Sequence, residues 1–288
     1  MSNLPILAPT LFRFQLGDYF EAVIDFLTEN LAWLFDGITA IVEGMIDGFE
    51  AALAWPPAIV LIVIITLLAW LASGRKLGLA IGTFVGLFLI DTLDLWPEAT
   101  ETIALILVAS FIALLIGIPT GIFASRNKAI SENVIRPVLD FMQTMPAFVY
   151  LIPAVIFFGL GTVAGAIATI IFSMPPVVRL TNLGIRQVPA EVVEAGRSLG
   201  STPRQLLFKV QLPIALPTIL AGVNQTILLA LSMVVIASMI GAGGLGNPVL
   251  RGITSLDIGT GFEGGVSVVV LAMILDRITQ ALGESTSK

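Results

Sequence analysis

Long apolar stretches separated by short polar segments make up most of this chain. A transmembrane helix needs about 20 apolar residues, with a range of about 17–25. The stretch 77–90 falls below that range, so it is also compatible with a re-entrant segment. The pattern predicts an all-α, multi-pass transmembrane helix bundle of about seven spans, at 57–73, 77–90, 102–124, 138–158, 162–178, 215–240 and 264–282. A tight turn is predicted at 159–161, where two glycines flank Leu160 between the fourth and fifth spans.

Composition agrees with a protein that lies mostly in lipid. The chain has 288 residues, of which 57% are hydrophobic and 12% charged, whereas a soluble domain has about 25% charged residues. It contains no cysteine and no histidine, which excludes disulfides, thiolate chemistry and the usual switch near neutral pH. No signal peptide is expected, because the first residues are neither basic nor followed by an apolar core and a cleavage site.

The distribution of lysine and arginine predicts the orientation, because cytoplasmic loops carry an excess of cations. Only Arg13 and Arg251 of the 14 cations fall on the predicted outer side. We therefore expect the N-terminus outside and the C-terminus inside, an alternation that needs an odd number of spans and so favours keeping 77–90. The other 12 follow the first, third and fifth spans or lie at the C-terminal end: Arg75, Lys76, Arg126, Lys128, Arg136, Arg179, Arg186, Arg197, Arg204, Lys209, Arg277 and Lys288.

The first 56 residues form an acidic region, with eight acidic residues and one cation. Apolar residues recur there at spacings of three and four, which predicts an amphipathic helix, or two helices broken near Gly37, Gly44 or Gly48. Two interpretations remain open. The helix lies in the outer interface against the bundle, or it forms a surface that contacts an extracytoplasmic partner.

The longest predicted cytoplasmic loop, 187–213, carries the signals of two short helices. Such signals include prolines in first turns, charges that complement the helix dipole, and capping residues at both ends. In the first helix they are Pro189 in the first turn, Glu191 and Glu194 near its start, Arg197 near its end and Gly200 as a left-handed cap. In the second they are Ser201 or Thr202 as the cap, Pro203 in the first turn and Pro213 at the end.

The first of these helices presents a compact apolar surface, formed by Val192, Val193, Ala195 and Leu199. The small residues Ala195 and Gly196 allow a partner to approach closely. A short rigid helix that a second helix holds away from the membrane works as a lever. Such a lever can pass movement between a soluble protein and the transmembrane bundle.

The loop also contains E-A-G at 194–196, Gly200, and V-x-L-P at 210–213. In spacing, this pattern resembles the EAA loop of bacterial ABC-importer permeases, with Gly196 and Val210 as mild departures. The resemblance implies that residues 192–199 form the coupling helix that sits in a groove of the ATPase subunit; without it, the segment is an ordinary helical hairpin. The residues given a coupling role are Val192, Val193, Glu194, Ala195, Gly196, Arg197, Leu199, Gly200, Leu212 and Pro213.

Three longer segments extend the resemblance. They are FMQTMPAFVYLIPAVIFFGLG from Phe141, MPPVVRLTNLGIRQVP from Met174, and AGVNQTILLALSMVVIASMIGAGGLG from Ala221. Over about 102–283 the chain is similar to the permease of glycine betaine/proline betaine importers. This implies a type I ABC-importer permease in a bacterial cytoplasmic membrane, working as a homodimer with two ATPase subunits and an extracytoplasmic substrate-binding protein.

The predicted organisation of the chain follows from the spans and this resemblance. It comprises the extracytoplasmic acidic region 1–56, peripheral spans at 57–100, a permease core at 101–283 that contains the coupling loop, and a cytoplasmic tail at 284–288. No phosphate-binding loop of the form G-x-x-x-x-G-K-[ST] occurs. We therefore expect no enzymatic activity, bound cofactor or metal in this chain, with ATP and Mg on the partner ATPase, and no nucleic-acid partner.

The fourth span is a candidate lining element of the translocation pathway. Betaines carry a quaternary ammonium, which aromatic ring faces attract, although aromatics that face lipid or pack in the bundle are commoner. Pro146 and Pro153 interrupt its helix, as in membrane segments that form a hinge or line a cavity. Its candidate residues are Phe141, Phe148, Tyr150, Phe157 and Phe158, together with Gln143.

The sixth span carries five polar side chains, which either bond neighbouring helices or contact substrate. They are Asn224, Gln225, Thr226, Ser232 and Ser238, of which Asn224, Gln225 and Ser232 are pathway candidates. In the last span, Asp276 is either a structural charge beside Arg277 or part of a proton relay. The glycine-rich segment 241–246 is either a flexible turn or a close-packing site, and in either case a candidate gate element.

The combined prediction is a membrane permease subunit of an ATP-driven importer for glycine betaine or a related quaternary-ammonium or proline osmoprotectant, working by alternating access. Choline, carnitine and proline remain open as substrates, since a separate binding protein largely sets selectivity in this family. One rival is a secondary transporter driven by an ion gradient, which would need buried acids in mid-span, and none is convincing. The other is a non-transporting membrane scaffold.

Overall fold

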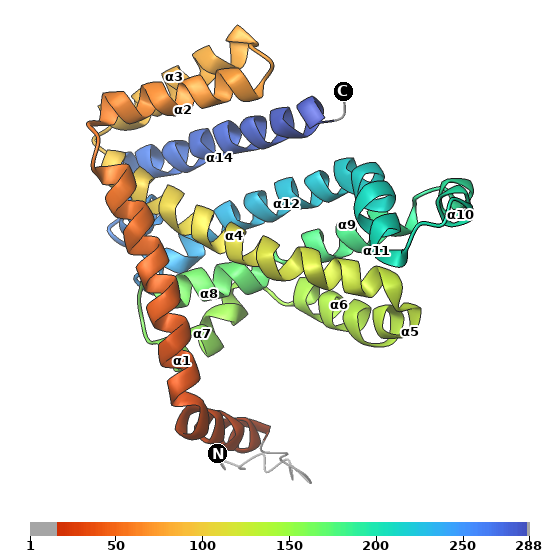
Figure 1. The fold of residues 1–288 in the computed structure, drawn as a ribbon. Helices are drawn as coiled ribbons and strands as arrows, with labels where there is room; N and C mark the ends of the chain where they lie inside the picture. The colour runs from red at the N-terminus through yellow and green to blue at the C-terminus, as the bar shows by residue number, and fades with distance from the viewer. Residues whose placement is uncertain (1–15, 287–288) are drawn as a thin grey trace, which may run out of the picture.

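The computed structural model describes residues 16–286, and every element within that range is helical (Figure 1), as predicted. Residues 1–15 of the acidic region and 287–288 of the tail lie outside the described residues. The longer helices are α1 (Leu16–Ala54), α2 (Ala58–Ala72), α3 (Leu77–Thr92), α4 (Trp96–Arg126), α8 (Thr162–Ser173), α9 (Pro175–Arg186), α12 (Leu212–Ser238) and α14 (Ile258–Thr286). The shorter ones are α5 (Lys128–Ile130), α6 (Arg136–Thr144), α7 (Leu151–Phe158), α10 (Ala190–Ser198), α11 (Pro203–Leu206) and α13 (Gly246–Thr254), with a 3-10 turn (Ala147–Tyr150) and two π-helical turns (Ser131–Ile135 and Leu207–Gln211).

Fewer helices are long enough to cross a bilayer than the seven predicted. Within the described residues, four helical segments are long and apolar enough, and the number rises to six if each of two bent helix pairs is one span. Each predicted range does contain a helix, but α2 and α3 have 15 and 16 residues, fewer than the about 20 that a full crossing needs. The four segments are Trp96–Arg126, Thr162–Arg186, Pro203–Ser238 and Ile258–Ala281.

The predicted fourth span, 138–158, is a broken helix rather than a continuous one. Its two parts meet at 109° because Pro146 has no N–H to donate and holds Met145 before it in an extended conformation, with φ −72° and ψ 133°. The Tyr150 hydroxyl donates a hydrogen bond to the Met142 carbonyl across the break. Pro153 causes no second break, contrary to the prediction, since it lies in the first turn of α7.

The centre of the bundle is a close-packed group of α4, α8, α9 and α12. Glycines permit the closest approaches: a Cβ on Gly117 of α4 would lie 2.5 Å from Val177 Cγ1 of α9, and one on Gly222 of α12 would lie 3.1 Å from Val177 Cα. Small residues at crossings are the usual means by which membrane helices pack tightly. This packing fixes the end of α9, where the predicted coupling loop begins, and the start of α12, where the loop ends. It also fixes the position of α4 beside them.

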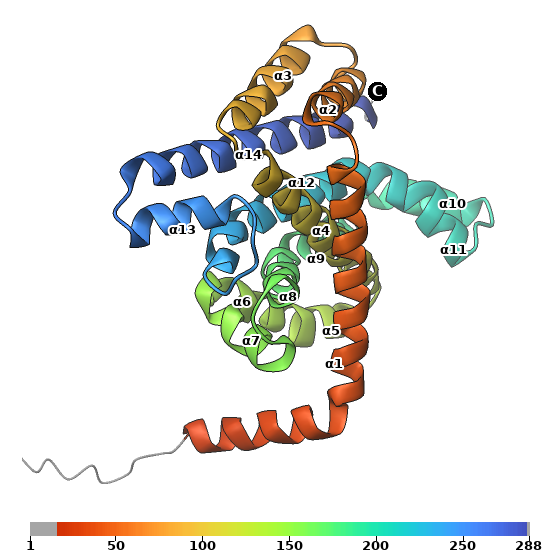
Figure 2. The ribbon, with the colours of Figure 1, turned by 90° about the vertical axis from the view of Figure 1, so that its left-hand side faces the viewer.

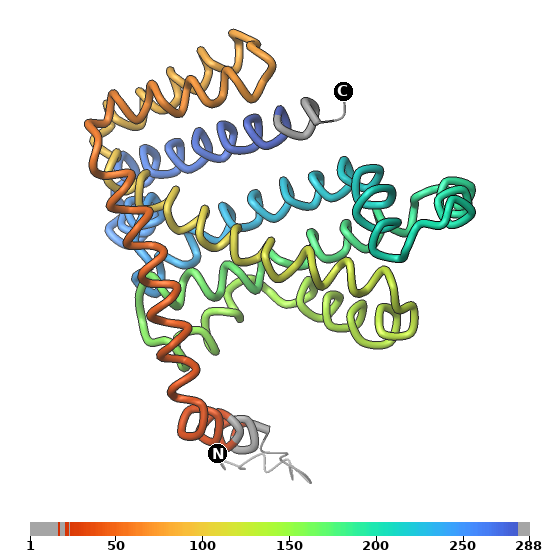
Figure 3. Tube along the Cα trace, in the orientation of Figure 1, coloured from red at the N-terminus to blue at the C-terminus, as the bar shows by residue number. Residues whose placement is uncertain are grey.

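The helices α2 and α3 form a hairpin that runs alongside α14 at the edge of the bundle (Figure 3). Leu87 and Ile90 of α3 are fully buried in a cluster with Ile62 of α2 and Leu271 of α14. The hairpin is therefore a packed part of the bundle, and its remaining surface consists mostly of exposed aliphatic and aromatic side chains.

Helix α1 runs crosswise to α4, α12 and α14, at the end of the bundle opposite α10 (Figures 1 and 2). Its Val42 and Ile46 are buried against Val108 of α4 and Ala166 of α8, which confirms the predicted contact with the bundle. The part of α1 from Ile24 onward meets α2 at 103°.

The bend in α1 does not lie near any of the three glycines at which it was predicted. It lies at Leu31, where φ is −116° and ψ is 16°, whereas Gly37, Gly44 and Gly48 all lie in regular helix. A Cβ on any of these glycines would have no atom within 4 Å. They therefore neither break the helix nor serve a close contact.

Candidate functional site

The loop between α9 and α12 projects from one end of the bundle and carries α10 at its tip (Figure 1). Pro189 is the N-cap, one position before the helix, rather than a residue of its first turn as predicted. Arg197 lies in the last turn, as predicted. Gly200 has φ +78°, its N–H donates to the Arg197 carbonyl at 2.9 Å, and the N–H of Ser201 donates to the Gly196 carbonyl at 3.1 Å. The predicted left-handed cap is thus confirmed.

The second helix of the loop begins as predicted but does not end at Pro213. Thr202 is its cap: the Gln205 N–H donates to Thr202 Oγ1 at 3.3 Å, and the Thr202 N–H donates to Gln205 Oε1 at 2.9 Å, a reciprocal capping box. Pro203 follows in the first turn. From there α11, the π-helical turn Leu207–Gln211 and α12 form one continuous helical segment that runs to Ser238.

The π-helical turn explains why Pro213 does not terminate this helix. Within an α-helix, a proline loses one hydrogen bond, and its ring clashes with the carbonyl four residues before it. Here the Leu212 N–H instead reaches the Leu207 carbonyl, five residues back, and the wider turn moves the backbone away from the proline ring. The same arrangement occurs at Ser131–Ile135, which is followed by Arg136 and Pro137.

The outer face of α10 is an apolar stripe made by Val192, Ala195 and Leu199, spaced by three and four residues. Val192 is 38% exposed and Leu199 is 87% exposed, and Ala195 is also exposed. We call these three residues the α10 stripe. An exposed leucine on the tip of a projecting helix has no folding role within this chain, so the stripe is suited to contact another protein.

Two residues assigned to this outer surface instead face the protein. A Cβ on Gly196 would lie 2.8 Å from Leu206 Cδ1 of α11, so its small size lets α10 pack on its own supporting helix rather than on a partner. Val193 is half-buried and lines a cavity of about 230 Å³ between α10 and the bundle. Glu194 and Arg197 line the same cavity and make no hydrogen bond or ion pair among residues 16–286.

Long-range contacts attach the loop to the end of α4. The Arg126 guanidinium donates to the Pro203 carbonyl at 3.2 Å, and that of Arg186 donates to the Ala124 carbonyl at 3.1 Å. Leu212 packs into a cluster with Ile185 of α9 and other apolar side chains at the base of the loop, whereas Pro213 is exposed. The sequence predicts both arginines only as cytoplasmic cations, because no neighbouring residue determines which carbonyl groups they contact.

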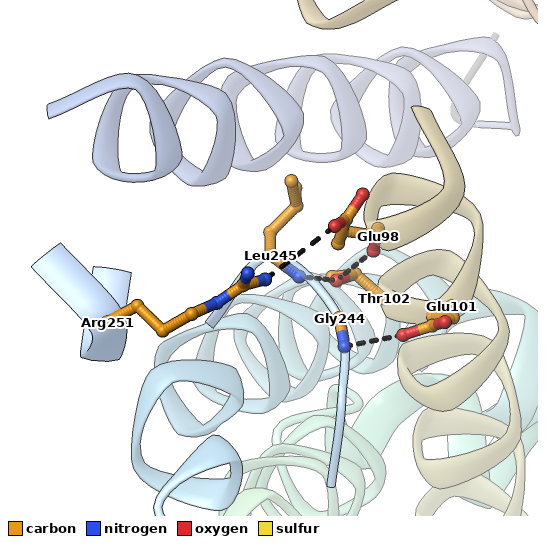
Figure 4. A network of polar contacts seen from close by, with 6 residues as sticks. All are labelled: Glu98, Glu101, Thr102, Gly244, Leu245 and Arg251. Atoms are coloured by element: carbon orange, nitrogen blue, oxygen red, sulfur yellow. Dashed lines mark hydrogen bonds and ion pairs between the residues drawn. The ribbon is translucent and has the colours of Figure 1, made fainter. Parts of the chain in front are cut away.

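At the opposite end of the bundle, the turn between α12 and α13 is fastened to α4 (Figure 4). The Gly244 N–H donates to Glu101 Oε2 and the Leu245 N–H donates to Thr102 Oγ1, both at 2.8 Å. Gly244 has φ +71°, and a Cβ there would lie 2.4 Å from Thr102 Oγ1. Glu98 approaches Arg251 of α13 at 3.9 Å. Of the two interpretations of segment 241–246, close packing is confirmed.

The beginning of α14 shows one perturbed acid outside the predicted spans. Asp257 accepts hydrogen bonds from the Thr260 hydroxyl at 2.8 Å and from the Thr260 N–H at 3.3 Å. These hydrogen bonds stabilise the carboxylate and so lower the pKa of Asp257 below its ordinary value. The group is exposed, and its position at the helix start indicates capping rather than chemistry.

The aromatic residues of the fourth span do not form one cluster. Tyr150 is buried and packs edge-on against Phe172 at 5.9 Å between ring centroids. Phe157 stacks on Phe35 of α1 at 4.6 Å, and Phe158 meets the same ring edge-on at 5.6 Å. All three rings thus pack against other parts of the bundle. The remaining candidates of this span, Phe141, Gln143 and Phe148, are exposed.

The polar residues of the sixth span divide in a similar way. Asn224 bonds across to α14: its side-chain amide donates to Asp276 Oδ1 at 3.0 Å, and its oxygen accepts from the Thr279 hydroxyl. Asp276 also accepts from Gln280 at 2.7 Å, so it is a hydrogen-bonded structural group. Gln225 and Ser232 lie exposed on α12, and the Ser232 hydroxyl donates to its own helix at the Leu228 carbonyl.

Replacing Asn224 with leucine tests this structural assignment. We expect the free energy of unfolding of the purified chain to fall by about 1 kcal/mol, because two interhelical hydrogen bonds are lost, each worth about 0.6 kcal/mol in a membrane. Denaturation in detergent, in a double-mutant cycle with Thr279→Val, would measure the coupling. The neighbouring Gln225→Leu is the matched control and should leave stability unchanged. An Asn224 variant of normal stability but altered solute affinity would instead place this residue in the pathway.

The described residues form an all-helical bundle of membrane-spanning length, with a short helix that carries an exposed apolar stripe at one end, the architecture of a membrane transport subunit. The chain belongs to the family of binding-protein-dependent transport system inner membrane components, whose model matches residues 117–288. It is similar to the glycine betaine/proline betaine transport system permease protein ProW of Escherichia coli (strain K12), with 49% identity over 97% of this chain and 81% of that protein.

Two further relatives match over nearly their whole length. The glycine betaine transport system permease protein OpuAB of Bacillus subtilis (strain 168) is 47% identical over 93% of this chain and 94% of its own. The glycine betaine/carnitine transport permease protein GbuB of Listeria monocytogenes serotype 1/2a (strain 10403S) is 50% identical over 96% and 98%. The predicted family is therefore confirmed.

Among solved structures, the inward-facing MetNI methionine ABC transporter resembles this chain, with a TM-score of 0.59. The alignment covers 65% of this chain and 93% of that chain at 20% identity. At this level of identity the likeness concerns the fold alone. The fold is that of an ABC-importer permease, and the chain is a multi-pass protein of the inner membrane.

Proposed function

We propose that this chain is the permease subunit of an ATP-driven importer of glycine betaine or a related quaternary-ammonium or proline osmoprotectant. The observation that carries the proposal is the α10 stripe, an apolar docking surface that the loop holds away from the bundle. Relatives of nearly full length that are named for glycine betaine transport support the substrate class. One relative is named for carnitine as well, so carnitine stays a candidate substrate, as do choline and proline.

In the proposed mechanism, two copies of the permease form a homodimer that alternates between inward-facing and outward-facing states. The α10 stripe of each copy docks on one of two ATPase subunits, which bind ATP and Mg. Closure of the ATPases moves α10, and the contact of Gly196 with Leu206 passes this movement to α11. From α11 it enters the continuous helix through Leu212 to α12, and through Arg126 it reaches α4.

We further propose that the end carrying α10 is cytoplasmic and the end carrying α1 is outside, with the N-terminus outside and the C-terminus inside. The cations support this orientation, since Arg126, Arg186 and Arg197 gather at the α10 end, as expected for a cytoplasmic face. A substrate-binding protein would then deliver solute at the end where α1 and the α12–α13 turn lie.

A secondary transporter is less well supported by the same residues. Its mechanism would need an acid in mid-span that is available to bind an ion. Asp276 is the acid of the last span, and hydrogen bonds from Asn224 and Gln280 already occupy its carboxylate. A scaffold without transport activity predicts no functional dependence on residues 192–199 and no ATPase partner.

The decisive experiment is co-reconstitution of the chain with its ATPase in liposomes, with and without the binding protein and glycine betaine. We expect ATPase activity and uptake to rise together with betaine. Stimulation by a different solute would replace the substrate and keep the class. If the chain associates with no ATPase, the coupling role of the α10 stripe is wrong, and a secondary transporter becomes the better account.

Replacing Arg126 with glutamine tests the link between the loop and α4. The variant loses one hydrogen bond from a charged donor to the Pro203 carbonyl, which is worth about 1 kcal/mol at an exposed site. We expect uptake per ATP hydrolysed to fall by about fivefold while ATPase binding stays normal. Lys128→Gln, at another exposed cation two residues along the chain, is the control. Equal coupling in both variants would remove Arg126 from the transmission route.

A further inference from the structure

A groove between α3 and α14 is not used by the proposed transport mechanism. It has a volume of about 560 Å³ and a mostly apolar lining, which includes Gly78, Gly82 and Gly86 of α3 and Met273 and Arg277 of α14. The three glycines recur every four residues, so they lie on one face of α3. The groove therefore lies between the α2–α3 hairpin and α14, which run side by side at the edge of the bundle (Figure 3).

The groove tapers from one end to the other. At Gly86 the helices are in contact, because a Cβ there would lie 2.7 Å from Val270 Cγ1 and 3.0 Å from Ile274 Cδ1. At Gly82 and Gly78 a Cβ would have no atom within 4 Å. The wide end is thus the end where α3 begins, which is also the end of the bundle that carries α10 (Figure 1). A transmembrane helix is about 10 Å wide along its whole length, so a narrowing groove fits a flexible chain better.

Polar groups at the groove specify the chemistry of its occupant. Thr83 lines the groove and is 1% exposed, and its hydroxyl has no hydrogen-bond partner among the described residues. Arg277 lines the same groove, is exposed, and forms no ion pair within residues 16–286. The Thr83 hydroxyl oxygen is itself shielded, so an occupant of the groove meets an apolar surface and a cation at the wide end. These two features match an acyl chain and a phosphate.

We propose that this groove binds one acyl chain of an anionic phospholipid from the leaflet on the α10 side. The acyl chain lies along Gly78 and Gly82 toward Gly86, and Arg277 at the wide end holds the phosphate. Basic pockets between transmembrane helices on the cytoplasmic side are typical sites for anionic headgroups. That this leaflet is the cytoplasmic one rests on the proposed orientation of the chain. The binding site itself does not depend on that orientation.

Native mass spectrometry of the full chain in detergent tests the site, with phosphatidylglycerol and phosphatidylcholine of equal chain length as probes. We expect one tightly bound lipid, with phosphatidylglycerol preferred by about fivefold, the effect of one cation near a headgroup. Gly82→Leu adds a side chain where a Cβ would meet no atom within 4 Å, so it fills the open groove and should abolish binding of both lipids. Arg277→Gln should keep binding but lose the preference.

Two control variants make these results specific. Gly44→Leu adds the same side chain at a position of α1 where a Cβ would meet no atom within 4 Å. Lys128→Gln removes a cation that does not line the groove. Neither variant should change lipid binding. A wild-type preference in Arg277→Gln, or full binding in Gly82→Leu, would overturn the proposal. These outcomes do not depend on transport, so they are separate from any failure of the proposed function.

The absence of cysteine from the sequence allows a direct test of the rival occupant, a helix of a second copy. In Gly82→Cys the new thiol is the sole thiol of the chain. We expect its alkylation by a maleimide to be slower in phosphatidylglycerol nanodiscs than in phosphatidylcholine nanodiscs, with no disulfide-linked dimer on oxidation. A disulfide-linked dimer, or equal alkylation in both lipids, would assign the groove to protein packing or to bulk lipid instead.

Discussion

Replacing Ala195 with aspartate is expected to weaken binding of the ATPase subunit by more than about a hundredfold. Ala195 is the middle member of the α10 stripe, between Val192 and Leu199, and its side chain is exposed in the isolated chain. A carboxylate buried without a partner in an apolar interface costs several kcal/mol, and about 3 kcal/mol already corresponds to a hundredfold change. Pull-down of the ATPase with the reconstituted permease, together with betaine-stimulated ATPase activity, would measure the loss.

The matched control for this variant is Ala190→Asp on the same helix. Ala190 is also exposed but lies away from the α10 stripe, beside the cavity under α10, and an acid in the first turn suits the helix dipole. This variant should bind the ATPase normally. Both variants should unfold like the original chain, because neither alanine is buried. Equal binding by the two variants would show that the ATPase does not dock on the α10 stripe.

Replacing Gly244 with alanine is expected to destabilise the chain by about 3 kcal/mol or more. The added Cβ would lie 2.4 Å from Thr102 Oγ1 and 3.4 Å from the Thr102 backbone nitrogen, and overpacking of this kind costs about 1–3 kcal/mol. Its φ of +71° adds about 1–2 kcal/mol of backbone strain for a residue with a Cβ. Denaturation of the purified chain in detergent would measure the change.

Gly241→Ala separates these two contributions. Gly241 also has a positive φ, of +85°, but the nearest atom to an added Cβ is 3.9 Å away. This variant should therefore lose only the strain energy, about 1–2 kcal/mol. If both variants lose the same amount, the added Cβ at Gly244 is accommodated without a costly overlap with Thr102, and the turn approaches α4 less closely than described.

The sequence predicted those features of the loop that depend on adjacent residues. The left-handed cap at Gly200 and the Thr202 cap before Pro203 are set by side chains within a few positions, and both are confirmed. The direction in which Val193 and Gly196 point depends on how α10 sits on α11. A helical stripe alone does not reveal which of its sides the rest of the chain covers.

The long-range features could not be predicted for the same reason. The Arg126 and Arg186 side chains each reach a carbonyl more than sixty positions away in the chain. The aromatic residues of the fourth span share one segment of the sequence, which predicts a single set of pathway candidates. In the structure, Phe157 and Phe158 pack on α1. In this bundle a proline predicted a break correctly at Pro146 and wrongly at Pro153, which lies in the first turn of α7, and at Pro213, which follows a π-helical turn.

Because of that π-helical turn, the spacing of the loop motif determines how α10 and α11 are rotated about the axis of α12. A residue advances an α-helix by about 100°, and the turn Leu207–Gln211 accommodates one residue more than an α-turn would. Removing that residue would turn everything before it, α11 and the α10 stripe included, by nearly a third of a revolution about the axis of α12. The number of residues between Gly200 and Pro213 therefore determines the direction in which the docking helix faces.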